Sequence, residues 1–296
     1  MYIARSSTLG FYALLALILG GGVAVIGWRV EGMSPWLGAL PVLVIGWLAF
    51  KNPLRRWRLA RRPFPEAWRT WLETHVPLYA HLDAAGRARF ERDVRFFLEE
   101  RAFEGVQGVE VTDVLRLSVG AGAALLLHGR PGWELPGQST ILFYPDRFDD
   151  DYYDTEDAAY DGMAHAQGPV ILSRRAVEES WAYAGDGNNV VLHELAHLFD
   201  FENAFADGTP SLLAPGSAAA WEKLVHQEMR RARIGKSLLR RYAATNPAEL
   251  FAVAVENFFE RPDALHRRHR TLFDALVAFF NLDPRLGEDA TEADEA

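Results

Sequence analysis

The feature that most constrains the fold is an uncharged apolar run near the N-terminus, from Leu9 to Trp28. About twenty helical residues rise roughly 30 Å, the thickness of the hydrocarbon core of a bilayer. A second uncharged run, residues 35–50, follows after a short polar segment. Pro41 would bend that run, although a neighbouring helix can satisfy the freed carbonyl group. The pattern predicts a hairpin of two transmembrane helices, at about 9–28 and 35–50.

A cleaved signal peptide is the alternative explanation of the first run. The apolar stretch is too long for one, no Ala-x-Ala cleavage site follows, and a second apolar run comes at once. Trp28, Trp36 and Trp47 lie near the predicted helix ends, where indole rings favour the headgroup region. We therefore expect the hairpin to be retained.

The flanking charges predict the orientation. Residues 51–63, KNPLRRWRLARRP, carry six basic residues and no acidic one, whereas Arg29 is the only basic residue between the two runs. Positive segments stay on the cytoplasmic side, so both termini and everything after the hairpin should face the cytoplasm. The same basic segment could bind anionic lipid headgroups.

Composition limits the chemistry of the rest of the chain. The net charge is −9, which argues against direct nucleic-acid binding, since phosphate neutralisation needs clustered Lys and Arg. The chain has no cysteine. Disulfides, thiolate ligands and cysteine nucleophiles are thereby excluded, and any metal site must use histidines and carboxylates. Length and composition predict a membrane hairpin (1–52), one globular domain (53–286) and an acidic disordered tail (287–296).

The globular part is expected to be α+β and mainly helical. Apolar residues at helical intervals predict a helix over 85–103, and a Thr112-Asp113 cap signal predicts a second over 112–129. The segments 140–145 and 168–173 are short, β-branched or aromatic, and bounded by Gly or Pro, as in strands. The acidic segment 146–162 between them is expected to be a solvated loop, because it lacks the carboxylate spacing of an EF-hand.

The segment NNVVLHELAHLFD, residues 188–200, contains the pattern His-Glu-x-x-His. Residues four apart share one face of a helix, so His193 and His197 could bind one metal ion, with Glu194 beside it to accept a proton from metal-bound water. Apolar neighbours indicate that this helix is buried, where two imidazoles and a carboxylate need partners. Asn188 and Asn189 are candidate N-caps.

A catalytic zinc site needs a third protein ligand. Glu202 is too close in sequence to reach back without distorting the helix end. The segment NPAELFAVAVENFFERP predicts an apolar helix that begins near Pro247 and contains Glu249 and Glu256, seven apart and on one face. Sequence pattern does not choose between these two. Asp200 is either an acid that orients an imidazole or a surface acid at the helix end.

Four segments together resemble one family. They are ERAFEGVQG (100–108), GPVILS, NNVVLHELAHLFDFENAFADGTP and YAATNPAELFAVAVENFFERP, and the resemblance covers roughly residues 63–282. The chain resembles the Mlc titration factor A-like zinc peptidases, of gluzincin type, with a catalytic core similar to that of anthrax lethal factor. The resemblance implies one Zn²⁺ per chain, bound by His193, His197 and Glu249. It implies Glu194 as general base and Tyr242 as a donor to the oxyanion.

The resemblance makes Glu256 a residue that supports the site, paired with an arginine, and makes peptides or proteins the expected substrates. The strand Val170, Ile171 and Leu172 is expected to pair with extended substrate. The hairpin departs from the soluble members of the family. We therefore expect a multi-pass protein of the bacterial inner membrane with a cytoplasmic zinc peptidase domain. The alternative is a regulatory protein that binds an Mlc-like transcriptional repressor and uses zinc structurally.

Overall fold

The computed structural model describes residues 1–4, 6–30, 34–136, 140–148, 160–165, 168–200 and 217–285. The chain forms two compact units, Met1–Pro63 and a second that begins at Phe64. The predicted division into 1–52, 53–286 and a tail stays a prediction, and the tail lies outside the described residues.

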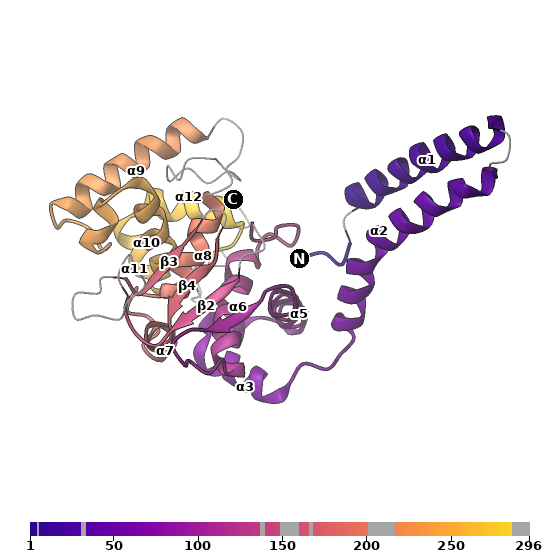
Figure 1. The fold of residues 1–296 in the computed structure, drawn as a ribbon. Helices are drawn as coiled ribbons and strands as arrows, with labels where there is room; N and C mark the ends of the chain where they lie inside the picture. The colour runs from indigo at the N-terminus through magenta and orange to yellow at the C-terminus, as the bar shows by residue number, and fades with distance from the viewer. Residues whose placement is uncertain are drawn as a thin grey trace. The chain divides into compact units, whose positions relative to one another are not determined.

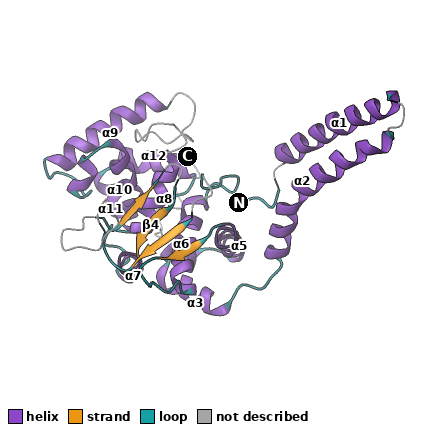
Figure 2. Cartoon of the chain, in the orientation of Figure 1, coloured by secondary structure: helices purple, strands orange, loops and turns teal. Residues whose placement is uncertain are grey.

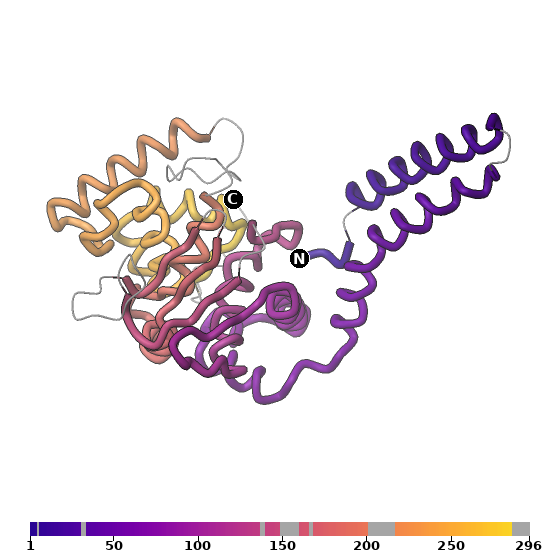
Figure 3. Tube along the Cα trace, viewed as in Figure 1, coloured from indigo at the N-terminus to yellow at the C-terminus, as the bar shows by residue number. Residues whose placement is uncertain are grey.

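The first unit consists of α1 (Ser6–Arg29), a 3-10 turn η1 (Pro35–Gly38) and α2 (Ala39–Ala60). The two helices lie side by side (Figure 3). A Cβ atom at Gly20 would lie 2.9 Å from the carbonyl oxygen of Gly38, so glycine permits this close approach. Both helical segments are long and apolar enough to cross a membrane, with mean hydropathies of 2.3 and 1.4.

The second helix differs from the prediction in two ways. It continues through the basic segment to Ala60, because a charged run marks the edge of an apolar span without ending a helix, and Lys, Arg and Leu are good helix formers. Pro41 lies in the first turn of α2, where a backbone N–H would have no hydrogen-bond partner within the helix. A proline there breaks no helical hydrogen bond, so the bend expected at Pro41 is not required. Pro53 is the proline inside the helix.

The second unit is mainly helical with one small sheet, as predicted (Figure 1). The helices are α3 (Glu66–His75), α4 (Pro77–His81), α5 (Ala84–Glu100), α6 (Asp113–Leu127), α7 (Arg174–Ala182), α8 (Val190–Asp200), α9 (Ala218–Arg233), η2 (Arg241–Ala244), α10 (Pro247–Glu260), α11 (Pro262–Arg268) and α12 (Arg270–Phe280). The strands are β1 (Phe103–Gly105), β2 (Ile141–Tyr144), β3 (Gly162–Ala164) and β4 (Val170–Ser173).

The sheet has the order β1-β2-β4-β3, and Figure 2 shows its strands among the helices. β1, β2 and β4 are parallel, and β3 pairs antiparallel with β4, with Met163 opposite Ile171. Val170, Ile171 and Leu172 therefore lie in a strand with partners on both edges. The expectation that these residues pair with substrate is wrong, because their backbone N–H and C=O groups are already used. The outer strand on this side of the sheet is β3.

Polar caps fix where the central helices begin. The Thr112 side chain accepts a hydrogen bond from Leu115 N at 3.2 Å and starts α6, as the cap signal predicts. Asn189 caps α8 by accepting from Leu192 N at 3.1 Å. The helix predicted over 85–103 ends instead at Glu100, because Arg101 is extended. Phe103 then enters β1 and stacks on Phe143 of β2, with ring centroids 6.4 Å apart.

Candidate metal centre

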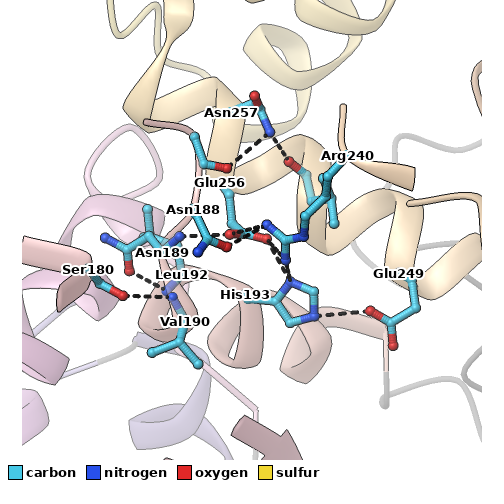
Figure 4. A network of polar contacts seen from close by, with 12 residues as sticks. Ser180, Asn188, Asn189, Val190, Leu192, His193, Arg240, Glu249, Glu256 and Asn257 are labelled. Atoms are coloured by element: carbon cyan, nitrogen blue, oxygen red, sulfur yellow. Dashed lines mark hydrogen bonds and ion pairs between the residues drawn. The ribbon is translucent and has the colours of Figure 1, made fainter. Parts of the chain in front are cut away.

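Three side chains from two helices converge on one point. His193 and His197 come from α8 and Glu249 from α10, and one ligand atom of each lies within 4.8 Å of the others. His193 Nε2 lies 3.0 Å from Glu249 Oε2 and 3.3 Å from His197 Nε2, and the latter lies 3.8 Å from Glu249 Oε1. Figure 4 shows His193 and Glu249 facing each other across the gap between their helices.

The local sequence explains this convergence. The Asn189 cap sets the rotation of α8, which places His193 and His197 one turn apart on one face. The Asn246 side chain caps α10 by accepting from Glu249 N at 2.9 Å. Glu249 therefore lies in the first turn of its helix, and α10 packs against α8.

The donor set fits a zinc ion. Both imidazoles are buried, at 6% and 8% exposure, and Glu249 is nearly so. Two imidazole nitrogens and a carboxylate oxygen are the His₂Glu ligand set of catalytic zinc sites, which leave one position open for water. The cluster lines a cavity of about 220 Å³ that leaves room for such a position.

The two imidazoles have opposite electrostatic surroundings. Burial alone would lower the pKa of His193, but the carboxylates of Glu256 and Glu249 raise it to about 10. Burial and the neighbouring His193 lower the pKa of His197 to about 4. A cation bound between the two rings would replace the proton that His193 shares with Glu249.

Glu194 lies next to the edge strand of the sheet. It is buried, it lines the cavity with His193 and His197, and its carboxylate accepts a hydrogen bond from the backbone N–H of Ala164 in β3. Burial raises the pKa of Glu194 to about 7. A Cβ atom at Gly162 would lie 2.6 Å from Glu194 Cγ, so only glycine fits at this position of β3.

Glu256 lies behind His193, on the side away from Glu249 (Figure 4). Its Oε1 is 2.7 Å from His193 Nδ1 and 2.8 Å from a guanidinium nitrogen of Arg240, and its Oε2 accepts from Asn189 N at 2.7 Å. Burial would raise the pKa of Glu256, but His193 and Arg240 hold it below its usual value. The carboxylate is therefore ionised, and His193 Nδ1 donates to it.

Tyr242 follows Arg240 by two residues, in η2. Its ring centroid is 6.0 Å from that of His193, and its hydroxyl group hydrogen-bonds to Glu249. Burial and the carboxylate of Glu249 raise the pKa of this hydroxyl above its usual value. With its pKa raised, the hydroxyl group stays protonated. The residue is 44% exposed and lines the cavity, so this hydroxyl group is within reach of a molecule bound there.

The remaining predicted residues are placed as follows. Asp200 is buried at the last position of α8, and its role as a partner of an imidazole stays a prediction. Glu202 and most of the acidic segment 146–162 lie outside the described residues. Sequence reasoning missed Arg240 and Gly162. The expected pairing of Glu256 with an arginine was the one signal for Arg240, and it did not specify which arginine. No sequence pattern distinguished Gly162 from the other glycines.

A second, larger cavity of about 690 Å³ opens beside the first. The two share Tyr160, Gly162, His193, Glu194 and Tyr242. Arg147 and Tyr183 line only the larger one. The cluster is therefore accessible from a space large enough for several side chains.

A buried His-Glu-x-x-His helix joined by a glutamate from a second helix, in an α+β domain, is the construction of a metallopeptidase. The chain belongs to the family of glucose-regulated metallo-peptidases M90, whose family model matches residues 51–281. This confirms the family to which the four sequence segments pointed.

Relatives cover most of the chain. An uncharacterized protein of Synechocystis sp. is 30% identical over 244 residues, which are 78% of this chain and 89% of that protein. Mlc titration factor A of Yersinia enterocolitica is 29% identical over 242 residues, 76% of this chain and 90% of its own. Mlc titration factor A of Klebsiella pneumoniae is 30% identical over 226 residues, 71% and 84% of the two chains.

Proposed function

We propose that this protein is a zinc-dependent peptidase that hydrolyses peptide bonds, tethered to the cytoplasmic face of the bacterial inner membrane. The observation that carries the proposal is the convergence of His193, His197 and Glu249, with Glu194 in the same cavity. Intact Glu194 favours catalysis, because a purely structural zinc site does not need a general base.

Zinc, when bound by these three ligands, would polarise the scissile carbonyl group and make a water molecule more acidic. Glu194 accepts the proton of the attacking water and delivers it to the leaving amine. The N–H of Ala164 keeps the Glu194 carboxylate oriented. Tyr242 donates its hydroxyl hydrogen to the oxyanion that forms at the scissile carbon.

Extended substrate would pair with β3, since its partner β4 occupies only one of its edges. Main-chain hydrogen bonds to β3, other than from the Ala164 N–H that donates to Glu194, would place the scissile bond beside Glu194, because Gly162 and Glu194 are in contact range. This assigns to β3 the role that the sequence suggested for Val170–Leu172.

Glu194→Gln tests the mechanism. The variant should bind one zinc ion per chain, as wild type does, and lose turnover, because glutamine fills the same space and cannot accept a proton. Zinc content is measured by elemental analysis and turnover with a quenched peptide library. Glu178→Gln, an exposed acid of α7, is the matched control and should keep both. Full activity of Glu194→Gln would refute the mechanism.

The membrane tether is tested with single cysteines, which are unique because the chain has none. Ser34→Cys, between the two apolar helices, should react with an impermeant maleimide in intact cells. Glu178→Cys should react only after the cells are opened. Labelling of both in intact cells, or of neither, would contradict the proposed topology.

A second candidate function is capture of a transcriptional repressor such as Mlc, favoured by the name of two relatives. Capture would survive Glu194→Gln, since binding a partner needs no general base. Co-purification of a repressor with wild type and with this variant, without cleavage of any substrate by wild type, would favour this function over the peptidase.

A further inference from the structure

The described part of the chain contains two triads in which a buried glutamate lies between a buried histidine and a half-buried arginine. In the candidate site, His193 Nδ1 lies 2.7 Å from Glu256, and Arg240 lies 2.8 Å from the same carboxylate. The Glu256 side chain is 0% exposed, and that of Arg240 is 36% exposed. The guanidinium group contacts both oxygens of Glu256 and also donates to Asn188 Oδ1 at 2.8 Å.

The second triad lies elsewhere in the same unit. His269 Nδ1 is 2.6 Å from Oε2 of Glu228, and Arg231 Nη1 is 2.9 Å from Oε1 of the same carboxylate. Arg231 is thus paired with one oxygen, whereas Arg240 contacts both oxygens of Glu256. Its glutamate is 2% exposed and its arginine 36% exposed, which matches the first triad closely. The two triads therefore offer a comparison within one molecule.

What faces the second ring nitrogen differs between them. His269 Nε2 accepts a hydrogen bond from the backbone N–H of Leu238 at 3.0 Å. A glutamate that holds the hydrogen on Nδ1 leaves Nε2 with a lone pair directed away from it. In the first triad the same nitrogen of His193 faces Glu249 and His197, where the family's metal would bind.

We propose that Arg240 is a positioning residue for the metal: it fixes Glu256, and through Glu256 it holds His193 with Nε2 directed at the ion. The inference rests on the proposed zinc site. Glu256 has a donor on each oxygen besides Arg240, namely His193 Nδ1 and Asn189 N. The two-pronged contact with Arg240 adds a planar, charged partner that spans both oxygens, and it therefore strengthens the restraint on rotation of the carboxylate about its terminal bond.

Arg240, like His193, lines the larger cavity. Tyr242 lines it too, and the guanidinium carbon of Arg240 lies 5.8 Å from the centroid of the Tyr242 ring. Residues 240–242 thus include both Arg240, which contacts the glutamate that holds His193, and Tyr242, the proposed oxyanion donor.

Arg240→Met tests the inference in the full-length protein, with Arg231→Met as the matched control. Zinc dissociation constants are measured by competition with a chromophoric chelator, and apo-protein stability by thermal unfolding. We expect Arg240→Met to weaken zinc binding by about 10–100-fold. Arg231→Met, which removes the arginine of the second triad, should leave zinc affinity within about twofold of wild type.

A second readout does not depend on the zinc measurement, and a second variant covers the case in which Arg240→Met does not fold. The Nδ1–H of His193, followed by NMR in labelled protein, should exchange slowly in wild type and in Arg231→Met and rapidly in Arg240→Met. Arg240→Lys, which can contact only one oxygen of Glu256, should fold and show an intermediate zinc affinity.

The outcomes separate the two proposals. Unchanged zinc affinity in Arg240→Met and Arg240→Lys would overturn the inference while leaving the peptidase proposal intact. Equal weakening by Arg240→Met and Arg231→Met would also overturn it, because general destabilisation would then explain both. A wild-type protein that binds no zinc would refute the proposed function, and the exchange rate of the His193 Nδ1–H would then decide whether Arg240 acts on this ring.

Discussion

Gly162 in β3 lies against Glu194 in α8 so closely that a Cβ atom at residue 162 would be 2.6 Å from both Cγ and Oε1 of the glutamate. Real Cβ atoms do not approach other heavy atoms to that distance, so any side chain at residue 162 must displace Glu194 or the strand. The proposed general base and the proposed substrate-binding strand can therefore lie this close together because residue 162 has no side chain.

Gly162→Ala should reduce turnover by about 100-fold or more, because a shift of about 1 Å in a catalytic group is enough for such a loss. Zinc stoichiometry should stay at one, since the clash is with Glu194 and not with a ligand. Gly168→Ala, where a Cβ atom would lie 3.0 Å from the side chain of His165 and touch no site residue, is the control. Equal activity of the two variants would show that turnover does not depend on the close approach of residue 162 to Glu194.

Glu249 and Glu256 should respond differently to replacement. Zinc at 100 times its dissociation constant should stabilise wild type by about 2.7 kcal/mol. Glu249→Ala should lose this zinc-dependent rise in Tm, because one of three ligands is gone. Glu256→Gln should instead destabilise the apo-protein by about 3 kcal/mol, since it leaves Arg240 without its buried partner, and should still bind zinc, more weakly. The reverse result would exchange the two assignments.

Tyr242→Phe should lower kcat by about 100-fold and leave KM and zinc affinity nearly unchanged, because the hydroxyl group is expected to donate only as negative charge develops on the substrate oxygen. Tyr183→Phe is the control, as Tyr183 lines the larger cavity without contributing to the cluster. A loss of zinc in Tyr242→Phe would show that the hydroxyl group acts mainly by holding Glu249 in place.

Several helices, among them α5, α6, α8 and α10, and the placement of the two histidines on one helix face could be predicted because their signals are local. Caps such as Thr112 and the four-residue spacing of His193 and His197 depend only on neighbours in sequence. Glu249 and Glu256 could not be separated this way, since seven residues return to the same face of a helix. About 10 Å along the axis separates them, and only the packing of α10 on α8 decides which one faces His193 Nε2 and which one faces Nδ1.

The edge strand was missed for a similar reason. β3 is Gly-Met-Ala, three residues with little strand propensity that follow an acidic stretch. Its place in the sheet comes from pairing with β4, a contact between segments whose register no sequence signal specifies. The prediction of a substrate strand therefore fell on the apolar segment 170–172, which is buried in the sheet because it is the better strand former.

Away from the site, His128 should make the protein less stable in mild acid. The residue is 3% exposed, its ring lies 5.9 Å from that of Phe90, and Arg89 lies 3.0 Å from its Nε2. Burial and the charge of Arg89 lower the pKa of His128 to about 4. Since the unfolded chain takes up this proton near pH 6.5, the folded state keeps its full stability above pH 6.5. It loses stability as the pH falls towards 4, by up to about 3 kcal/mol from this group.

His128→Gln isolates that contribution, because glutamine can accept from Arg89 and does not titrate. Urea unfolding of both proteins at several pH values between 4 and 7 gives the difference in the free energy of unfolding. The variant should lose less stability than wild type over this interval, and the difference should close above pH 6.5 apart from a constant offset. Parallel curves for the two proteins would show that His128 keeps an ordinary pKa in the folded state, and that burial beside Arg89 does not keep it neutral.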